Sequence, residues 1–367
     1  MHPLAPRPSV GLVLTALPPP PSLAGIAERV EARLRDVLEP EAARWGAFDP
    51  DLIDAIREIE RLVLAGGKRL RPAFCHWGFV GAGGDPDAQV MVDAGAAFEL
   101  MHAFALFHDD VMDDASSRRG APTTHTLFAE RHAAGGWAGE SRRFGEGVAI
   151  LVGDLAFVYA DELMRGTSPA AWAIWNELRI ELNIGQFLDI LGSVRNDRRL
   201  EKAQKICRYK SGKYTIERPL HLGAVLAAPE RADVLLPGLS RYGLPLGDAF
   251  QMRDDVMGVF GDESVTGKPV GGDLREGKPT PLMARAVAAA NPAQLEVLDL
   301  VGRPGLTADD VARIQQVIVH TGALADLEAT IASLTDEALA AIAEVDLTPQ
   351  ARDELVQLAH YVSWRHV

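Results

Sequence analysis

The stretch AQVMVDAGAAFELMHAFALFHDDVMDDASSRRG, residues Ala88 to Gly120, decides the fold. It is apolar on nearly every side as far as Leu106, which is typical of a helix buried at the centre of a bundle. We expect this helix to continue to Asp114. From about Leu23 onward, apolar residues recur at spacings of three and four, and strand-like alternation is nearly absent. The sequence therefore predicts an all-α protein.

Eight further segments have the helical period and are expected to surround the central helix. They are Asp51 to Leu64, Val148 to Met164, Ala170 to Leu191, Leu200 to Lys210, Val234 to Gly258, Pro281 to Ala290, Asp309 to Ile318 and Gly322 to Ile342. Two glycine-containing segments, Ala133 to Gly147 and Gly261 to Lys278, are expected to be exposed loops.

No linker rich in Pro, Gly or Ser divides the chain, and its 47% apolar composition suffices for a large core. We therefore expect one domain over residues 23–367, preceded by a disordered tail over residues 1–22. The tail contains a short apolar run, Val10 to Leu17, but prolines follow it and only Arg7 precedes it. It is therefore a poor signal peptide.

Charge and composition exclude several classes of partner. Acidic residues number 51 against 37 basic ones, which argues against a nucleic-acid partner held by a general basic field. No uninterrupted apolar stretch reaches the roughly 20 residues of a membrane-spanning helix. The two cysteines, Cys75 and Cys207, are far apart, so neither a disulfide framework nor a zinc site is indicated. We expect a cytoplasmic protein without a membrane span.

Four aspartates fall within six residues in the segment HDDVMDDASSRRG, residues His108 to Gly120. Asp109 and Asp113 are four residues apart, so on a helix their carboxylates lie one turn apart and repel each other. Magnesium would compensate them, since it accepts one or two carboxylates and completes its shell with water and phosphate oxygens. A solvated acidic helix end is the alternative interpretation.

A second acidic pair, Asp254 and Asp255, ends another apolar helix in the segment FQMRDDVMGVFGD. If the two acidic helix ends face each other across a bundle, several metal ions could hold one diphosphate between them. A polar helix terminus is again the alternative, but the same unusual arrangement occurs twice.

Lysine is scarce, with seven lysines against thirty arginines, and five of the seven lie in four basic motifs. These motifs are Gly66 to Pro72, Arg118 with Arg119, Tyr209 to Lys213, and Thr266 to Lys278. Arginine and lysine side chains bind phosphate, and glycines let the backbone approach it. Each motif alone could be a solvated turn or a helix cap, whereas together they indicate a site for two diphosphates.

In this order, from about Gly66 to Lys278, the motifs resemble those of the trans-isoprenyl diphosphate synthases, the polyprenyl synthetase family, and are most similar to those of bacterial geranylgeranyl diphosphate synthases. The resemblance implies a single-domain helical bundle of the isoprenoid synthase type with a central active-site cavity. It also implies a homodimer that uses Mg²⁺, with three ions when substrate is bound. The substrates would be isopentenyl diphosphate and an allylic diphosphate (dimethylallyl, geranyl or farnesyl).

The resemblance also assigns roles to individual residues. For isopentenyl diphosphate it implies Lys68, Arg71, His102 and Arg119; for the allylic diphosphate Arg118, Lys210, Ser211, Gln251 and Lys268, with Lys278 as a further substrate ligand. For metal and catalysis it implies Asp109, Asp110, Asp113, Asp254 and Asp255, with Lys210 also catalytic. Without the motifs around it, His102 would be read as a core histidine.

One position departs from the family pattern. The second motif usually reads DDxxD, but this chain has DDVMG, with Gly258 in place of the last aspartate. We expect this substitution to weaken the metal site, and Asp262, four residues further, is the candidate to contribute instead.

In the family's chemistry, the allylic diphosphate leaves as an anion, and the double bond of isopentenyl diphosphate attacks the carbocation in a dry pocket. The growing chain would run along the helix below Asp109, and one helical turn is roughly as long as one isoprene unit. Small Ala105 leaves room there, and Phe104 and Met101 are expected to form the floor. This predicts geranylgeranyl diphosphate, with farnesyl diphosphate as the alternative product.

Two other functions share part of this pattern. A class I terpene cyclase shares the fold and the first aspartate motif but does not need the basic motif Gly66 to Pro72, and its usual second motif with Asn, Ser and Glu is absent. A non-catalytic partner subunit of another prenyltransferase should have lost ligands, and only Gly258 is such a loss.

Overall fold

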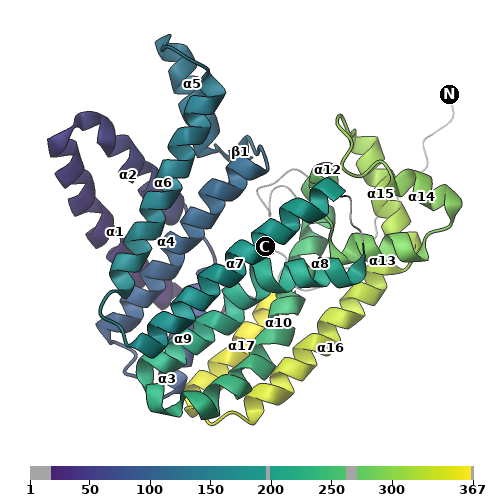
Figure 1. Cartoon of the computed structure of the whole chain (residues 1–367). Helices are drawn as coiled ribbons and strands as arrows, with labels where there is room; N and C mark the ends of the chain where they lie inside the picture. The colour runs from purple at the N-terminus through teal and green to yellow at the C-terminus, as the bar shows by residue number, and fades with distance from the viewer. Residues whose placement is uncertain (1–17, 196–198, 262–270, 365–367) are drawn as a thin grey trace.

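The computed structural model describes residues 18–195, 199–261 and 271–364. Apart from one pair of two-residue strands, β1 (Ser117–Arg118) and β2 (Ala121–Pro122), its regular elements are helices (Figure 1). The α-helices are α1 (Ser22–Phe48), α2 (Ile53–Leu64), α3 (Leu70–Gly81), α4 (Gln89–Met112), α5 (Thr124–Gly135), α6 (Ser141–Met164), α7 (Pro169–Arg195), α8 (Leu200–Cys207), α9 (Arg218–Ala227), α10 (Ala232–Phe260), α12 (Gly272–Glu276), α13 (Pro281–Ala289), α14 (Pro292–Leu298), α15 (Ala308–His320), α16 (Ala323–Ala343) and α17 (Pro349–Trp364). Two 3₁₀ turns, η1 (Pro50–Leu52) and η3 (Pro229–Arg231), and a π-helix, η2 (Arg208–Glu217), complete the list. The all-α prediction is confirmed.

Helix α4 is the central helix that the sequence predicts. It packs against α6, α3 and α1, and its residues from Ala94 to Met101 are all buried. By length and composition α4 could cross a bilayer, but 67% of its most apolar stretch is buried inside the protein. Its apolar character is therefore explained by its place in the bundle.

Buried apolar side chains form two clusters. The larger one joins α4 to the helices around it, including α1, α3, α9 and α17. The smaller one joins the end of α10 to α13, α15 and the start of α16. Helix α10 contributes to both clusters, and the expectation of one domain over residues 23–367 stays a prediction.

The predicted loop from Ala133 to Gly147 is wrong over most of its length. Helix α5 continues to Gly135, and α6 begins at Ser141. Both ends are capped: Gly136 has a φ of 61°, and the Glu140 carboxylate accepts bonds from the backbone N–H groups of Arg142 and Arg143. A cap needs only a few residues, so glycines and polar residues in sequence made the connection look longer than it is.

Two other predicted boundaries also change. The helix expected from Leu200 to Lys210 is α-helical only to Cys207 and then continues as the π-helix η2. The expected loop from Gly261 to Lys278 contains the short helix α12, while residues 262–270 lie outside the described part of the chain.

Glycines allow η2 to pack backbone against backbone between α7 and α10. A Cβ atom at Gly185 of α7 would lie 2.3 Å from the Lys210 backbone nitrogen, and one at Gly212 of η2 would lie 3.0 Å from the Gly247 carbonyl carbon. Side chains at these positions would force the helices apart. The glycines therefore help to bring Lys210 and Ser211 to the side of the bundle where α4 and α10 end.

Candidate active site

A cavity of about 520 Å³ lies between the end of α10, η2, α12 and the turn before α3. The α4 carboxylates Asp109, Asp110 and Asp113 are not among its lining residues, but each contacts a cation that is: Lys210, Arg118 and Lys278 respectively. Nine residues that the sequence assigns to substrate or metal line the cavity. They are Lys68, Arg118, Arg119, Lys210, Ser211, Gln251, Asp254, Asp255 and Lys278. Residues from five separate parts of the chain are thus brought together, as a central active-site cavity requires. Lys268 and Asp262 lie outside the described residues.

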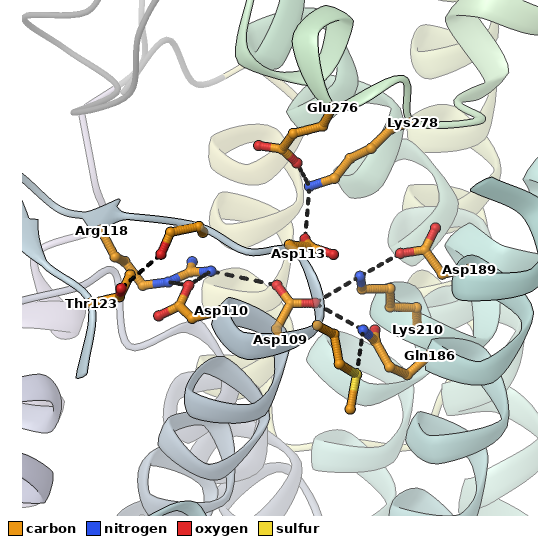
Figure 2. A network of polar contacts seen from close by, with 12 residues as sticks. Asp109, Asp110, Asp113, Arg118, Thr123, Gln186, Asp189, Lys210, Glu276 and Lys278 are labelled. Atoms are coloured by element: carbon orange, nitrogen blue, oxygen red, sulfur yellow. Dashed lines mark hydrogen bonds and ion pairs between the residues drawn. The ribbon is translucent and has the colours of Figure 1, made fainter. Parts of the chain in front are cut away.

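Asp109 is the most connected carboxylate at the end of α4 (Figure 2). Its Oδ1 accepts hydrogen bonds from Lys210 Nζ at 3.1 Å and from Gln186 Nε2 at 3.0 Å. Its Oδ2 lies 3.4 Å from Nη2 of Arg118. Burial raises the pKa of Asp109, but the charges of Lys210, Lys278 and Arg118 outweigh burial, so the pKa lies below its ordinary value. Asp109 is therefore ionised.

Asp110 and Asp113, on the same helix end, meet different cations. Asp110 is buried and accepts a 2.7 Å bond from Arg118 Nε. Asp113 lies 3.7 Å from Nζ of Lys278, and Figure 2 shows it between Asp109 and Lys278. Burial, followed by the nearby charge of Asp109, raises the pKa of Asp113 to about 6. Only Asp109 and Asp113 share the lysine-bearing side of the site.

At the end of α10, Asp255 is 2% exposed. Its Oδ1 accepts a 3.0 Å bond from Gln251 Nε2, and its buried Oδ2 has no hydrogen-bond partner in the described part of the chain. Burial raises the pKa of Asp255 well above its ordinary value, and the negative charges of Asp273 and Asp254 raise it further. The positive charge of Lys278 opposes this rise in the pKa but does not reverse it.

The predicted isopentenyl ligands lie beside the turn that precedes α3. Arg119 has a φ of 53° and donates a 2.6 Å bond to the Gly66 carbonyl, and it lines the cavity together with Lys68. The Arg71 guanidinium stacks 4.1 Å above the Tyr214 ring, and the His102 ring centre lies 6.0 Å from that ring.

His102 is neutral in this setting. Burial and then the positive charge of Arg71 lower the pKa of His102 well below its ordinary value. Among the described residues, its buried Nδ1 atom has no hydrogen-bond partner. His102 is therefore not a core histidine whose polar atoms are all satisfied, which was the alternative interpretation of this residue.

Arg69 also belongs to the basic motif from Gly66 to Pro72, but its side chain is buried and stabilises the fold. Its side chain is buried in ion pairs with Glu99 of α4 and Glu31 of α1, and it donates a 2.6 Å bond to the Val63 carbonyl. These contacts fix the turn that presents Lys68 to the cavity.

The three predicted floor residues lie on α4 and not among the residues lining the described cavity. Met101 is fully buried, and Ala105 is partly exposed. The Phe104 ring packs against Phe157 of α6 with ring centres 4.7 Å apart. Their role in product length stays a prediction.

Sequence reasoning missed two residues of α7. Asp189 accepts a 2.6 Å bond from Lys210 Nζ, and Gln186 bonds to Asp109. Their signal was a polar pair three residues apart in the helical segment from Ala170 to Leu191, and Figure 2 shows both beside the end of α4. Asp273, also missed as an individual residue, lines the cavity from α12.

Comparison with known proteins agrees with the fold and identifies the family. The chain belongs to the polyprenyl synthetase family, whose sequence profile matches residues 54–318. It is similar to a geranylgeranyl pyrophosphate synthase from Corynebacterium glutamicum, crystallised with isoprenyl diphosphate and magnesium, with 37% identity, a TM-score of 0.86, and coverage of 93% of this chain and 99% of that one.

Two curated relatives are also similar over most of their length. A geranylfarnesyl diphosphate synthase from Aeropyrum pernix is 34% identical over 306 residues, 81% of this chain and 89% of the relative. A geranylgeranyl diphosphate synthase from Mycobacterium tuberculosis is 33% identical over 284 residues, 74% and 75% of the two chains. The family resemblance and the prediction of a prenyl-transferring enzyme are confirmed.

Proposed function

We propose that this protein joins isopentenyl diphosphate to an allylic diphosphate and releases geranylgeranyl diphosphate. The observation that carries the proposal is the division of one cavity into two anion-binding sides. Lys210, Arg118 and Lys278 lie around the end of α4, while Lys68 and Arg119 line the cavity beside the turn before α3. A reaction between two diphosphates needs both sides.

The residues present fit divalent cations. Lys210 and Lys278 already bring positive charge to Asp109 and Asp113, and Asp255 Oδ2 is buried without a hydrogen-bond partner in the described structure. No group of three His, Cys, Asp or Glu side chains in the described ranges converges as a complete ligand set. Magnesium tolerates this, because it takes its remaining ligands from phosphate and water.

We assign Asp109 and Asp113 to one side of this metal site, Asp254 and Asp255 to the other, and three Mg²⁺ ions to the substrate-bound enzyme. Bound metal would supply positive charge to the departing diphosphate. Asp110 bonds to Arg118 through Oδ1, which suits a residue that orients that arginine.

The protein's own residues would act as follows. Lys210, Arg118 and Gln251 hold the allylic diphosphate while its carbon–oxygen bond breaks. Lys68, Arg71, His102 and Arg119 hold isopentenyl diphosphate, whose double bond forms the new carbon–carbon bond. One proton then leaves the new chain, and the released diphosphate accepts it. The steps need no side-chain nucleophile.

The product assignment rests on the helix below Asp109. Phe104 is turned against Phe157, and Ala105 adds little bulk, so a chain running along this face would meet no aromatic ring at position 105. The similar synthases named above make products of different length, so chain length has to be measured on this protein.

We also propose a homodimer. Large apolar side chains stand exposed along α7 and α6, which is unusual for a face that meets only water. They are Ile180, Ile184, Phe187, Ile190 and Val194 on α7, and Ile150, Leu151 and Val158 on α6. The α7 residues recur at spacings of three and four and form one stripe. A second copy of the chain would cover this stripe, and light scattering on the purified protein measures its mass.

A cytoplasmic location also remains part of the proposal, and the two free, buried cysteines are compatible with it.

The decisive test is to incubate the purified protein with magnesium, isopentenyl diphosphate and, in separate reactions, dimethylallyl, geranyl or farnesyl diphosphate. Chromatography of the products should show geranylgeranyl diphosphate. Farnesyl diphosphate as the end product would change the product assignment alone. Hydrocarbon without elongation would point to a cyclase, and activity only with an added partner would point to an accessory subunit.

A further inference from the structure

The space that a side chain at position 258 would fill is already occupied. Gly258 is four residues after Asp254 on α10, so the two positions lie on one face of the helix, and both line the cavity. A Cβ atom at Gly258 would lie 2.0 Å from Oδ2 and 2.5 Å from Cγ of Asp273. The carboxylate of Asp273 therefore stands where the missing aspartate would begin.

Asp273 belongs to a different helix. It lies in the first turn of α12, and its backbone carbonyl accepts a 3.2 Å bond from the Lys278 N–H. Its negative charge raises the pKa values of both Lys278 and Asp255. Asp273 thus faces the second acidic pair, and the lysine on its other side also reaches Asp113 at 3.7 Å.

An independent observation concerns the buried carboxylate of Asp255. Asp255 is 2% exposed, and its Oδ2 atom has no hydrogen-bond partner within the described ranges. A desolvated carboxylate oxygen next to further carboxylates is costly unless positive charge joins it. Gln251 satisfies only the other oxygen, Oδ1.

We propose that Asp273 supplies the third carboxylate of the second acidic motif, from α12 and not from α10, toward the Mg²⁺ ions bound with the allylic diphosphate. This proposal rests on the proposed synthase function. Gly258 is then not a lost ligand, because its lack of a side chain makes room for Asp273. The sequence expectation that Gly258 weakens the site is replaced by an exchange of one carboxylate for another.

Variants that move a carboxylate from position 273 to position 258 test the proposal. The variants are Asp273→Asn, which keeps the shape and removes the charge, Gly258→Asp, and the double variant Gly258→Asp with Asp273→Ala. The readout is the magnesium concentration for half-maximal binding of a thio analogue of farnesyl diphosphate that cannot ionise, measured by calorimetry. This readout does not depend on turnover.

Asp273→Asn should raise that magnesium concentration about tenfold, the loss typical of a group that supports a metal site. Gly258→Asp should not lower it, because two carboxylates then compete for one volume. The double variant should bind magnesium better than either single variant, since it restores one carboxylate to that space. Thermal unfolding of each variant shows whether it is folded.

Glu276→Gln is the matched control. It removes a charge from the same helix and from the same lysine, but Glu276 is not among the atoms nearest to the 258 position. Its effect should be smaller than that of Asp273→Asn. If Asp273→Asn binds magnesium as the unaltered protein does, or if the double variant is no better than Gly258→Asp, the inference is wrong. If the unaltered protein does not bind the analogue with magnesium, the proposed function itself fails.

Discussion

The two acidic helix ends differ in where their compensating charges come from. At the end of α4, Asp109 accepts hydrogen bonds from Lys210, Gln186 and Arg118. At the end of α10, Asp255 has a glutamine on one oxygen and no hydrogen-bond partner for the other in the described structure. The negative charge of the first end is thus compensated by the protein's own cations, whereas at the second end a bound cation is proposed to do so. Two similar aspartate motifs can therefore differ in how their negative charge is compensated.

The largest effect on activity is expected from removing the carboxylate of Asp109. Asp109→Asn should lower kcat at least about a hundredfold, because Lys210, Gln186 and Arg118 all converge on this carboxylate. Steady-state kinetics at saturating magnesium measures the effect. Asp114→Asn is the matched control, since Asp114 is 71% exposed and forms an exposed ion pair with Arg142 at 3.7 Å. Equal losses in the two variants would contradict the special position of Asp109.

Removing the lysine that links α7, η2 and α4 should cost somewhat less. Lys210→Met keeps the length of the side chain but removes the charge shared by Asp109 and Asp189, so kcat/KM for the allylic substrate should fall about tenfold to a hundredfold. Lys205→Met, which breaks an exposed pair with Glu201, should leave kcat/KM unchanged. A Lys210→Met enzyme with normal kcat/KM would show that the first end does not depend on this cation.

The pH dependence of magnesium binding also distinguishes the acidic end of α4 from that of α10. The pKa of Asp113 is about 6 in the metal-free protein, so below that pH a cation must displace a proton. Magnesium affinity should therefore fall as the pH is lowered through 6, by up to about tenfold per pH unit. Binding of the thio analogue at pH 5 to 8 measures this fall. Asp113→Asn should bind more weakly at pH 8 and lose that part of the pH dependence. An unchanged profile would assign the dependence to the second end.

The smallest effect on rate is expected below the first end. Ala105→Phe should shift the product from geranylgeranyl to farnesyl diphosphate, because the new ring would stand one turn below Asp109 where the chain is proposed to run. Turnover should change by only about a few fold, as the charged groups stay in place. Chromatography of the products measures chain length, with Ala105→Ser as the control. The same product from both variants would refute the floor assignment.

The sequence predicted what lies within one helix better than what meets between helices. The spacing of Asp109 and Asp113 already placed them on one face of α4. The spacing of Gln186 and Asp189 likewise places them on one face of α7, but what they contact depends on α7 lying beside η2. The basic motif from Gly66 to Pro72 could not show that Arg69 is buried by Glu99 while Lys68 faces the cavity.

The proposed exchange between positions 258 and 273 is likewise hidden from spacing along the chain. A pattern along the chain counts carboxylates by their spacing, whereas an ion responds to the charges around it, whichever helix supplies them. Asp273 lies fifteen residues after Gly258 in a segment that reads as a glycine-rich loop. Nothing in that spacing says that the two positions share a volume.

The π-helix η2 has a consequence for how the chain tolerates length changes. A π-helix closes its hydrogen bonds one residue further along than an α-helix, so Arg208–Glu217 holds extra residues for its length. Deleting one residue there would let the segment wind as an ordinary α-helix. Because an α-helix turns by about 100° per residue and a π-helix by less, side chains inside the segment would then point in new directions relative to the helices on either side. Lys210 would be rotated away from Asp109 although every catalytic residue was still present, so deletion scanning would detect a requirement here that point substitutions miss.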